Sequence, residues 1–186
     1  MDLLTTRPKE DEPLIGLIER LLRELEGRTG WTLYLRPQFR IYPSLDTFRN
    51  STGDPGWVTA STRGHVIRLQ PPELLRSAGT LEATIRHELL HLLVEGHAHR
   101  GLPLWFREGI VFALAAAGPP ARDPGVFHNT AVLERALTRP QTHQEAEQAY
   151  QTARARVESL IGKYEKDRVL GWVQHGLPPA VLAGAH

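Results

Sequence analysis

The 186-residue chain contains no cysteine, and its single methionine is the first residue. Without cysteine, neither a disulfide bond nor a metal site built from thiolates can form. The lack of an internal methionine excludes one class of metalloenzyme, which is considered below. The absence of cysteine is compatible with any compartment, so it does not locate the protein.

The sequence also has almost no excess of charge of either sign, and it has few long apolar runs. The formal net charge is +1, which gives no support for a nucleic-acid or membrane partner, and we expect neither. No apolar run reaches the length of a membrane-spanning helix, and the first residues, MDLLTTRPKEDEP, are too charged for a signal peptide. We therefore expect a chain that is cytoplasmic as written or a trimmed piece of an exported or anchored protein, and the sequence leaves both open.

The remaining composition is typical of a soluble globular protein, with 41% hydrophobic and 23% charged residues. A chain of this length can bury one substantial core. We predict a flexible N-terminus over residues 1–12, a single domain over 13–178 and a C-terminal tail over 179–186. Neither length nor composition determines an oligomeric state.

The first half predicts one long helix followed by a small sheet. The helix is expected from Asp11 to Gly27, with Pro13 in its first turn. Its apolar residues recur at helical spacing: Leu14, Leu17, Ile18, Leu21, Leu22 and Leu25. The segments that follow predict a strand, a weaker strand, a short helix and the two strands of a hairpin: 31–35, 40–44, 45–51, 56–61 and 65–70.

The second half is helical throughout. Thr80 is the expected N-cap of a helix that ends at Gly96, and Thr142 with Glu145 predicts a capping box for a long helix. The predicted helices are 81–96, 104–117, 130–137, 143–161 and 165–175. A small N-terminal sheet with helices, followed by a mostly helical half, predicts an α+β fold.

The stretch RHELLHLLVEGHAH, residues 86–99, carries the most specific signal. His87, Glu88 and His91 make the pattern H-E-x-x-H on a predicted helix. Residues four apart lie one turn apart on the same face, so both imidazoles can reach one ion. Glu88 lies about 60–100° around the helix from them, at 3.6 residues per turn. It can therefore approach a metal-bound water without being a ligand.

The residues around this pattern favour a metal site. On a helical wheel the polar residues form one stripe: Thr84, His87, Glu88, His91 and Glu95. Apolar residues lie on both sides of the stripe, and only Glu82 and Arg86 mark an outward face. Buried ionisable groups need partners or a metal. The alternative is that the histidines form hydrogen bonds in a core or face solvent.

A catalytic zinc usually takes three protein ligands, and the third has several candidates. His97 follows His91 at the metzincin spacing, but that pattern needs a glycine where Val94 stands and an internal methionine, so we reject this class. Glu95 follows His91 by one turn but lies farther along the helix axis. We expect Glu95 beside the site or in its wall rather than on the metal.

The third candidate is Glu108, in LPLWFREGIVFAL. It is a lone carboxylate on a helical face that is otherwise apolar: Leu104, Trp105, Val111, Phe112 and Ala115. Such a carboxylate is destabilising unless it is compensated, and zinc would compensate it. The alternative is a glutamate that is solvated or paired with Arg100 or Arg107. Gly109 beside it permits the close approach of another backbone.

The two motifs HELLH (87–91) and WFREG (105–109) together resemble the gluzincin branch of zinc metallopeptidases, the thermolysin-like or peptidase MA-like group. Its pattern is H-E-x-x-H, a loop, and then W-x-x-E-G on the next helix. The resemblance implies one Zn²⁺ ion held by His87, His91 and Glu108. It also implies a zincin-like fold, with a mixed sheet before the metal helix and helices after it, over residues 30–175.

The resemblance further implies how a substrate would be held. In this family an edge strand of the sheet binds extended peptide, and HVIRLQ (65–70) is the matching strand. A downstream tyrosine or histidine stabilises the oxyanion, which makes Tyr150 a candidate catalytic residue, with His128 and His143 as alternatives. A tyrosine that only packs in the core is the other interpretation of Tyr150. These 186 residues have no room for the large C-terminal domain of thermolysin-like enzymes, so their specificity is not carried over.

The implied activity is hydrolysis of a peptide or protein substrate. Glu88 would act as general base, taking a proton from a zinc-activated water and passing it to the leaving amine. One alternative is a zinc-containing module that binds peptide or cell-wall material, or serves in assembly, without turnover. A purely structural zinc has no use for Glu88, which argues against that module. A metal-free helical scaffold is the second alternative.

Overall fold

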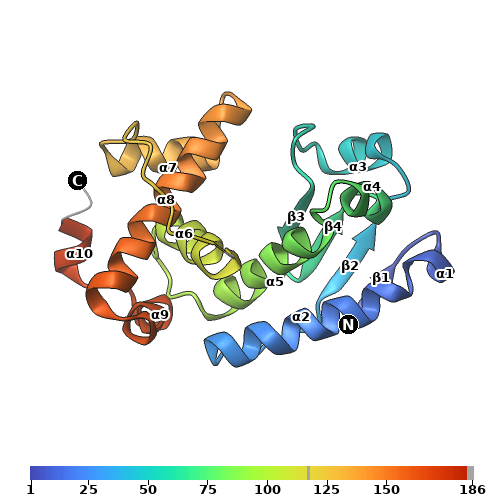
Figure 1. The fold of residues 1–186 in the computed structure, drawn as a ribbon, viewed down its shortest axis with the longest axis horizontal. Coiled ribbons are helices and arrows are strands. Elements are labelled where there is room, and N and C mark those ends of the chain that lie inside the picture. Colours follow the sequence, from blue (N-terminus) through green and yellow to red (C-terminus); the bar gives the residue numbers. More distant parts are fainter. Residues whose placement is uncertain (117, 184–186) are drawn as a thin grey trace. The chain divides into compact units, whose positions relative to one another are not determined.

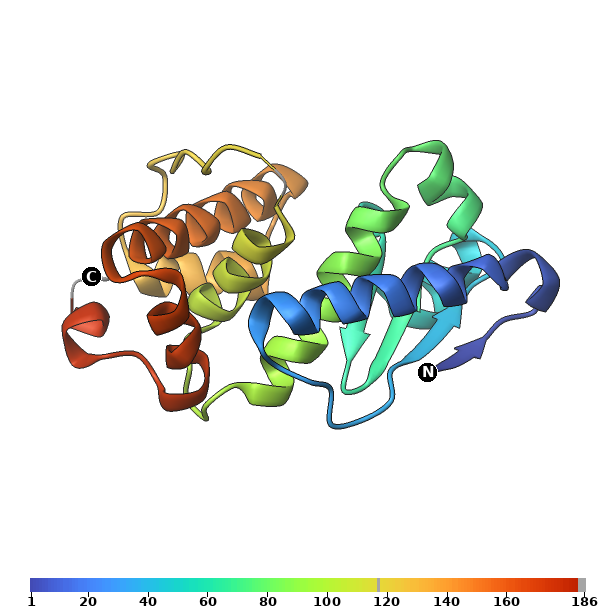
Figure 2. The same cartoon turned by 60° about the horizontal axis from the view of Figure 1, so that its bottom comes forward.

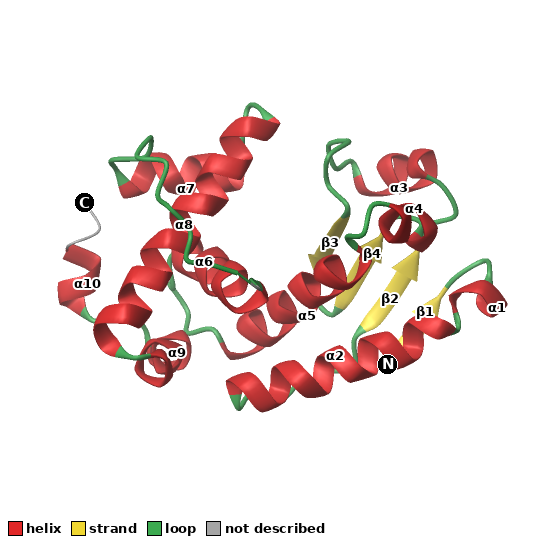
Figure 3. Cartoon of the chain, viewed as in Figure 1, coloured by secondary structure: helices red, strands yellow, loops and turns green. Residues whose placement is uncertain are grey.

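The computed structural model describes residues 1–116 and 118–183, so one residue of the helix predicted over 104–117 and the end of the predicted tail lie outside the described residues. The described elements are mostly helices together with one small sheet (Figures 1 and 3), which confirms the α+β class. Contacts divide the chain into two compact units, an N-terminal unit (Met1–Gly96) and a C-terminal unit (His97–His186). Within the part of the chain that is described, no helix combines the length and apolar character needed to cross a membrane.

The N-terminal unit contains a four-stranded mixed sheet. Its strands are β1 (Asp2–Leu4), β2 (Gln38–Ile41), β3 (Ala60–Arg63) and β4 (Val66–Leu69). In space the order is β1-β2-β4-β3, with β1, β2 and β4 parallel and β3 antiparallel to β4. β3 and β4 form the predicted hairpin, whose turn places Gly64 at a φ of 60°, a conformation that glycine adopts without strain.

One face of this sheet is apolar and the other is polar, because successive side chains of a strand point to opposite sides. Phe39 of β2 pairs in register with Ile67 of β4, and Ile67 pairs with Thr62 of β3. Phe39 and Ile67 are completely buried. The polar face carries the neighbouring row in the same register: Arg40, Arg68 and Ser61.

Two long helices, α2 (Pro13–Thr29) and α5 (Leu81–His97), supply most of the helical side chains of this core. They lie side by side, and Arg86 of α5 donates to Glu24 of α2 with an Nη1–Oε1 distance of 2.5 Å. Figure 2 turns the molecule so that α2 comes forward. The stripe of leucine and isoleucine on α2 is buried at four of the six predicted positions: Leu14, Ile18, Leu21 and Leu25.

Proline, glycine and serine residues mark the ends of the helices in this unit. α2 begins at Pro13, two residues after the predicted start at Asp11, which instead ends the short helix α1 (Pro8–Asp11). It continues through the exposed Gly27 and ends where Gly30 adopts a φ of 71°. The predicted short helix is confirmed as α3 (Leu45–Thr52), and the Ser44 side chain accepts from the backbone N–H of Thr47 at 3.2 Å. A further short helix is α4 (Pro72–Ser77).

The C-terminal unit is built from helices. They are α6 (Leu104–Ala115), α7 (Thr130–Thr138), α8 (His143–Tyr164), α9 (Lys166–His175) and α10 (Pro179–Ala183). α6 and α8 approach most closely at Gly109, where an added Cβ atom would lie 2.4 Å from the carbonyl oxygen of Ala153. The close backbone approach predicted for Gly109 is therefore confirmed. The predicted capping box is confirmed in its Thr142 half, since this hydroxyl accepts from the N–H of Glu145 at 3.0 Å. The Glu145 carboxylate accepts from the N–H of Gln141 and not from that of Thr142.

Three segments differ from their predictions. Residues 31–35 do not form a strand, and Tyr34 and Leu35 are 73% and 66% exposed. A strand is stabilised by pairing with its neighbours, and the position beside β4 is taken by β2, which overlaps the weaker predicted strand. The N-terminus expected to be flexible contains β1 and α1, and the expected tail contains α10. Elements this short have no periodic apolar pattern that a sequence can reveal.

Candidate metal centre

The candidate site begins on α5, a helix that is largely buried, as predicted. Its buried residues are Leu81, Ile85, Glu88, Leu89, Leu90, Leu92, Leu93 and Val94. Apolar side chains therefore anchor α5 on both sides of the polar stripe and fix its rotation. As a result His87 and His91, one turn apart, are directed to the same side.

His87 and His91 present the same atom to each other. Their Nε2 atoms lie 3.0 Å apart, the ring centroids are 4.6 Å apart and the ring planes meet at 80°. Burial, and to a smaller extent the neighbouring His91, lowers the pKa of His87 from 6.5 to about 3. The imidazole of His87 is therefore neutral at pH 7, which is the state that binds a metal ion.

Glu108 lies on α6, whose first turn is anchored by a carboxylate from another helix. The N-cap of α6 is Pro103, which gives no side-chain cap. Glu134 of α7 accepts instead from the backbone N–H groups of Leu104 and Trp105, at 3.2 and 2.7 Å. A carboxylate at a helix N-terminus is favourable because it pairs with otherwise unsatisfied donors.

The other residues of the WFREG motif also serve to fix α6. Trp105 is 2% exposed, and the Arg156 guanidinium lies 5.9 Å from the centre of its ring. Arg156 of α8 also donates to the carbonyl of Phe127 at 2.9 Å. Gly109 allows α6 to contact the backbone of α8 at Ala153. Each of these contacts restricts how α6 can rotate, and with it the direction of Glu108.

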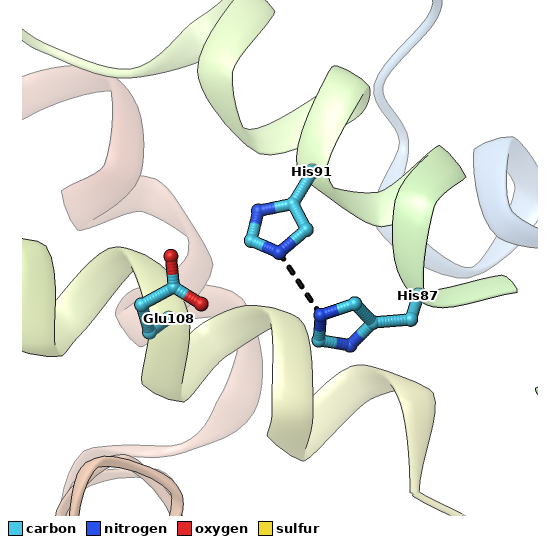
Figure 4. A group of neighbouring side chains, drawn as sticks. All are labelled: His87, His91 and Glu108. Carbon is cyan, nitrogen blue, oxygen red and sulfur yellow. Dashed lines mark hydrogen bonds between the residues drawn. The ribbon is translucent and has the colours of Figure 1, made fainter. Parts of the chain in front are cut away.

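His87, His91 and Glu108 form a group that could hold a metal ion (Figure 4). Each offers one ligand atom, and these atoms all lie within 4.8 Å of one another. Within residues 1–116 and 118–183, no other three histidine or acidic side chains have their ligand atoms this close together. Two imidazoles with one carboxylate are ligands typical of divalent transition metals.

The alternative ligands lie outside this group. Glu95 is exposed, and His97 is the last residue of α5. His128 and His143, the alternatives for stabilising an oxyanion, are both exposed. Of the predicted ligand candidates, the structure thus brings together the two histidines of H-E-x-x-H and the glutamate of W-x-x-E-G.

Tyr150, the predicted oxyanion-stabilising residue, lies half-buried on α8. Its ring packs on Phe112 of α6, with a centroid distance of 4.8 Å and an interplanar angle of 34°. Phe112 follows Glu108 by one helical turn. Tyr150 is therefore on the side of α8 that faces the Glu108-bearing helix, and its catalytic role stays a prediction.

Glu88 is 6% exposed and is held by the sheet. The Thr62 hydroxyl of β3 donates to Glu88 Oε2 at 2.6 Å. The strand register explains this contact, because Thr62 lies on the same face of the sheet as the buried Ile67. A hydrogen bond to a buried carboxylate offsets part of the free-energy cost of burying it.

The prediction that HVIRLQ is the edge strand is wrong. The segment contains β4, which lies between β2 and β3, whereas β3 is at one edge of the sheet. Both halves of a hairpin have similar apolar patterns, and the sequence does not reveal which half pairs with a third strand. Here β4 pairs with β2 through the register of Phe39 with Ile67 and of Ile41 with Leu69.

Three residues with structural roles near these elements were not found from the sequence. Thr62 has a signal in hindsight, since it is a polar residue at an inward position of an alternating strand. Glu134 and Arg68 have none. Glu134 reaches a helix 29 residues earlier in the chain. Arg68 is 9% exposed on β4, and its Nε and Nη2 atoms have no hydrogen-bond partner.

Comparisons of the chain with protein-family models, with curated proteins and with solved structures give no match. The resemblance to gluzincins therefore stays an expectation from the two sequence motifs.

Proposed function

We propose that the protein is a zinc-dependent metallopeptidase of the gluzincin type, with a zincin-like fold. The observation that carries the proposal is the group His87, His91 and Glu108, whose ligand atoms lie within 4.8 Å of one another. Glu88, between the two histidines in the chain, supplies the carboxylate that hydrolysis requires. A metal site without turnover would have no use for this buried carboxylate.

The distances support a zinc ion. Zinc bonds of about 2.0–2.2 Å in a tetrahedral site separate neighbouring ligand atoms by about 3.3 Å. The two Nε2 atoms at 3.0 Å need to separate only slightly. Glu108 would supply the third of the three protein ligands that a catalytic zinc usually takes.

When bound, zinc lowers the pKa of a water molecule towards neutrality and polarises the scissile carbonyl. Glu88 accepts a proton from the attacking water at its carboxylate and later donates that proton to the leaving amine. His87 and His91 stay neutral and hold the ion through ring nitrogens. Tyr150 is the candidate donor to the oxygen on which negative charge develops.

The substrate is proposed to bind as an extended chain along β3 instead of β4. Arg63 and Val66 flank the two-residue turn, so they form a hydrogen-bonded pair. The next pair, Thr62 and Ile67, is then a non-hydrogen-bonded pair, in which the main-chain groups of Thr62 point away from β4. A peptide strand can pair with these groups at the sheet edge.

The test compares the wild type with Glu88→Gln and with Glu95→Gln, an exposed carboxylate on the same helix. We expect one zinc ion per chain in all three by elemental analysis. Cleavage of a quenched fluorescent peptide library should fall about 10²–10⁴-fold in Glu88→Gln, the usual contribution of a general base, and should persist in Glu95→Gln. Glu108→Gln should weaken zinc affinity.

Each contrary result has a defined meaning. Full activity in Glu88→Gln would remove Glu88 from the role of base. Zinc in the wild type without cleavage of any peptide would indicate a non-catalytic zinc module that binds peptide or cell-wall material. A metal-to-chain ratio near zero that added zinc does not restore would exclude the metallopeptidase.

A further inference from the structure

We infer that Thr62 is a positioning residue that orients the Glu88 carboxylate for proton transfer. This inference rests on the proposed function. Its basis is the 2.6 Å hydrogen bond from Thr62 Oγ1 to Glu88 Oε2. Thr62 is in β3 and Glu88 in α5, so a strand fixes the direction of a side chain on a helix.

The bond acts on a part of Glu88 that the backbone does not control. Rotation of the terminal carboxylate is broad and has no sharp staggered minima. The hydroxyl of Thr62 donates to one named oxygen and therefore selects one orientation of the carboxylate plane. Because Glu88 is 6% exposed, little water competes for that oxygen, and the bond is stronger than it would be at the surface.

Thr62 is itself held firmly. Its β-branched side chain has restricted rotation about χ1, and its Cα is in register with the completely buried Ile67. The hairpin turn at Gly64 follows two residues later and fixes the end of the strand. The donor is thus positioned by the sheet before any substrate arrives, which is how preorganised sites accelerate a reaction.

The edge position of β3 adds a second consequence. The main-chain groups of Thr62 point to the open edge, and its side chain points to Glu88. A peptide that pairs with β3 is then held by the same residue that orients the base. Thr62 would thus fix the position of the substrate backbone relative to the Glu88 carboxylate. A small displacement of β3 would move the substrate and the carboxylate together.

The first experiment measures the bond without activity. Unfolding free energies of the metal-free protein are determined for wild type, Thr62→Val, Glu88→Met and the double variant. Thr62→Val keeps the shape and β-branching of the side chain and removes the donor. We expect the two substitutions to be coupled, with a factor of about ten between the measured unfolding constant of the double variant and that calculated for independent sites. Ser61→Ala, whose hydroxyl binds Asp54 on the opposite face, should show no coupling with Glu88.

The second experiment measures kinetics on the zinc-loaded full chain with a cleavable peptide. We expect Thr62→Val to lower kcat about tenfold, with KM and zinc content unchanged. Thr62→Ser, which restores the hydroxyl, should return kcat to within about threefold of wild type. Ser77→Ala, which removes an exposed hydroxyl of α4, should leave kcat unchanged. If Thr62→Val folds poorly, the comparison of Thr62→Ser with Thr62→Ala replaces it.

The outcomes separate this inference from the proposed function. Coupling with a kcat loss that serine rescues supports the positioning role. Absence of coupling overturns it, and so does coupling with an unchanged kcat, which would leave Thr62 a purely structural partner. Coupling in a wild type that cleaves no peptide would overturn the proposed function, and the positioning role with it, while the bond itself would stand.

Discussion

The Nε2 atoms of His87 and His91 lie 3.0 Å apart, close enough that only one of the two can carry a proton between them. A second proton on these atoms would set two N–H groups against each other with no acceptor between them. Burial, and to a smaller extent the neighbouring His91, lowers the pKa of His87 to about 3. A neutral imidazole is the form that the proposed zinc site requires.

A pH dependence of stability follows from this pKa. Folded His87 stays neutral down to about pH 3, whereas unfolded His87 binds a proton below about pH 6.5. The unfolded state therefore gains protons first, and the free energy of unfolding falls as the pH drops below 6.5. Between pH 7 and 5.5 we expect a loss of about 1 kcal/mol in the metal-free protein.

The measurement is urea unfolding of the metal-free protein at a series of pH values, with His87→Gln as the comparison. The range stops at pH 5.5 because the pKa values of Glu24, Glu73 and Glu82 are lowered below 4.5 by their arginine partners, so these carboxylates do not titrate in it. The His87→Gln variant should lose this part of the pH dependence. An identical slope in both proteins would contradict the prediction.

Substitution of Gly109 should destabilise the protein without changing any ligand. In Gly109→Ala the new Cβ would lie 2.4 Å from the Ala153 carbonyl oxygen and 2.6 Å from Val157 Cγ2, so α6 and α8 must separate. Such overpacking lowers the free energy of unfolding by about 1–3 kcal/mol. Gly162→Ala on α8 is the matched control, because nothing lies within 4 Å of its added Cβ.

Gly162→Ala should instead raise stability by about 0.5–1 kcal/mol, since alanine favours a helix more than glycine does. Thermal or urea unfolding distinguishes the two variants. Zinc affinity should fall in Gly109→Ala as well, because α6 carries Glu108. Equal stability of both variants would mean that the contact between α6 and α8 adapts without strain.

Arg68 offers a test of an unsatisfied charge. It is 9% exposed, and its Nε and Nη2 atoms have no hydrogen-bond partner. A buried donor that lacks a partner costs about 1–3 kcal/mol, and the exposed Arg40 lies beside it in register on β2. Arg68→Met should therefore leave stability unchanged or raise it by up to about 3 kcal/mol.

Arg40→Met is the control and should change stability by less than about 0.5 kcal/mol, as most surface substitutions do. Urea unfolding of both variants provides the measurement. A marked loss of stability in Arg68→Met alone would show that its guanidinium has a partner in solution, such as ordered water or an anion.

The predictable part of this molecule is the part with local signals. The helix at Leu81–His97 has an apolar pattern over four turns, and the sequence predicts the helix and the spacing of its histidines. The hydroxyl of Thr80, the predicted cap, donates to the carbonyl of Leu75. Glu108 was identified from a single charge on an apolar face. Gly109 is predicted to allow close approach because it has no side chain, and the backbone of α8 does approach it at Ala153.

The parts that failed depend on pairing between distant segments. WTLYL has strand-forming residues but does not form a strand, and the chain forms its strand at Gln38–Ile41 instead. The order of β3 and β4 depends on which hairpin strand meets β2. The contacts of Thr62 with Glu88 and of Glu134 with Trp105 span 26 and 29 residues, and no local pattern predicts them.

The carboxylate of Glu134 at the start of α6 has a consequence for the order in which the chain matures during synthesis. His87 and His91 belong to the N-terminal unit, and domains generally fold as units from the N-terminus on. Glu108 is set by partners that emerge later from the ribosome, first Glu134 and then Ala153. Under the proposed function, a nascent chain displays two histidines well before Glu108 is fixed, so zinc binding by all three residues belongs to the last stage of folding.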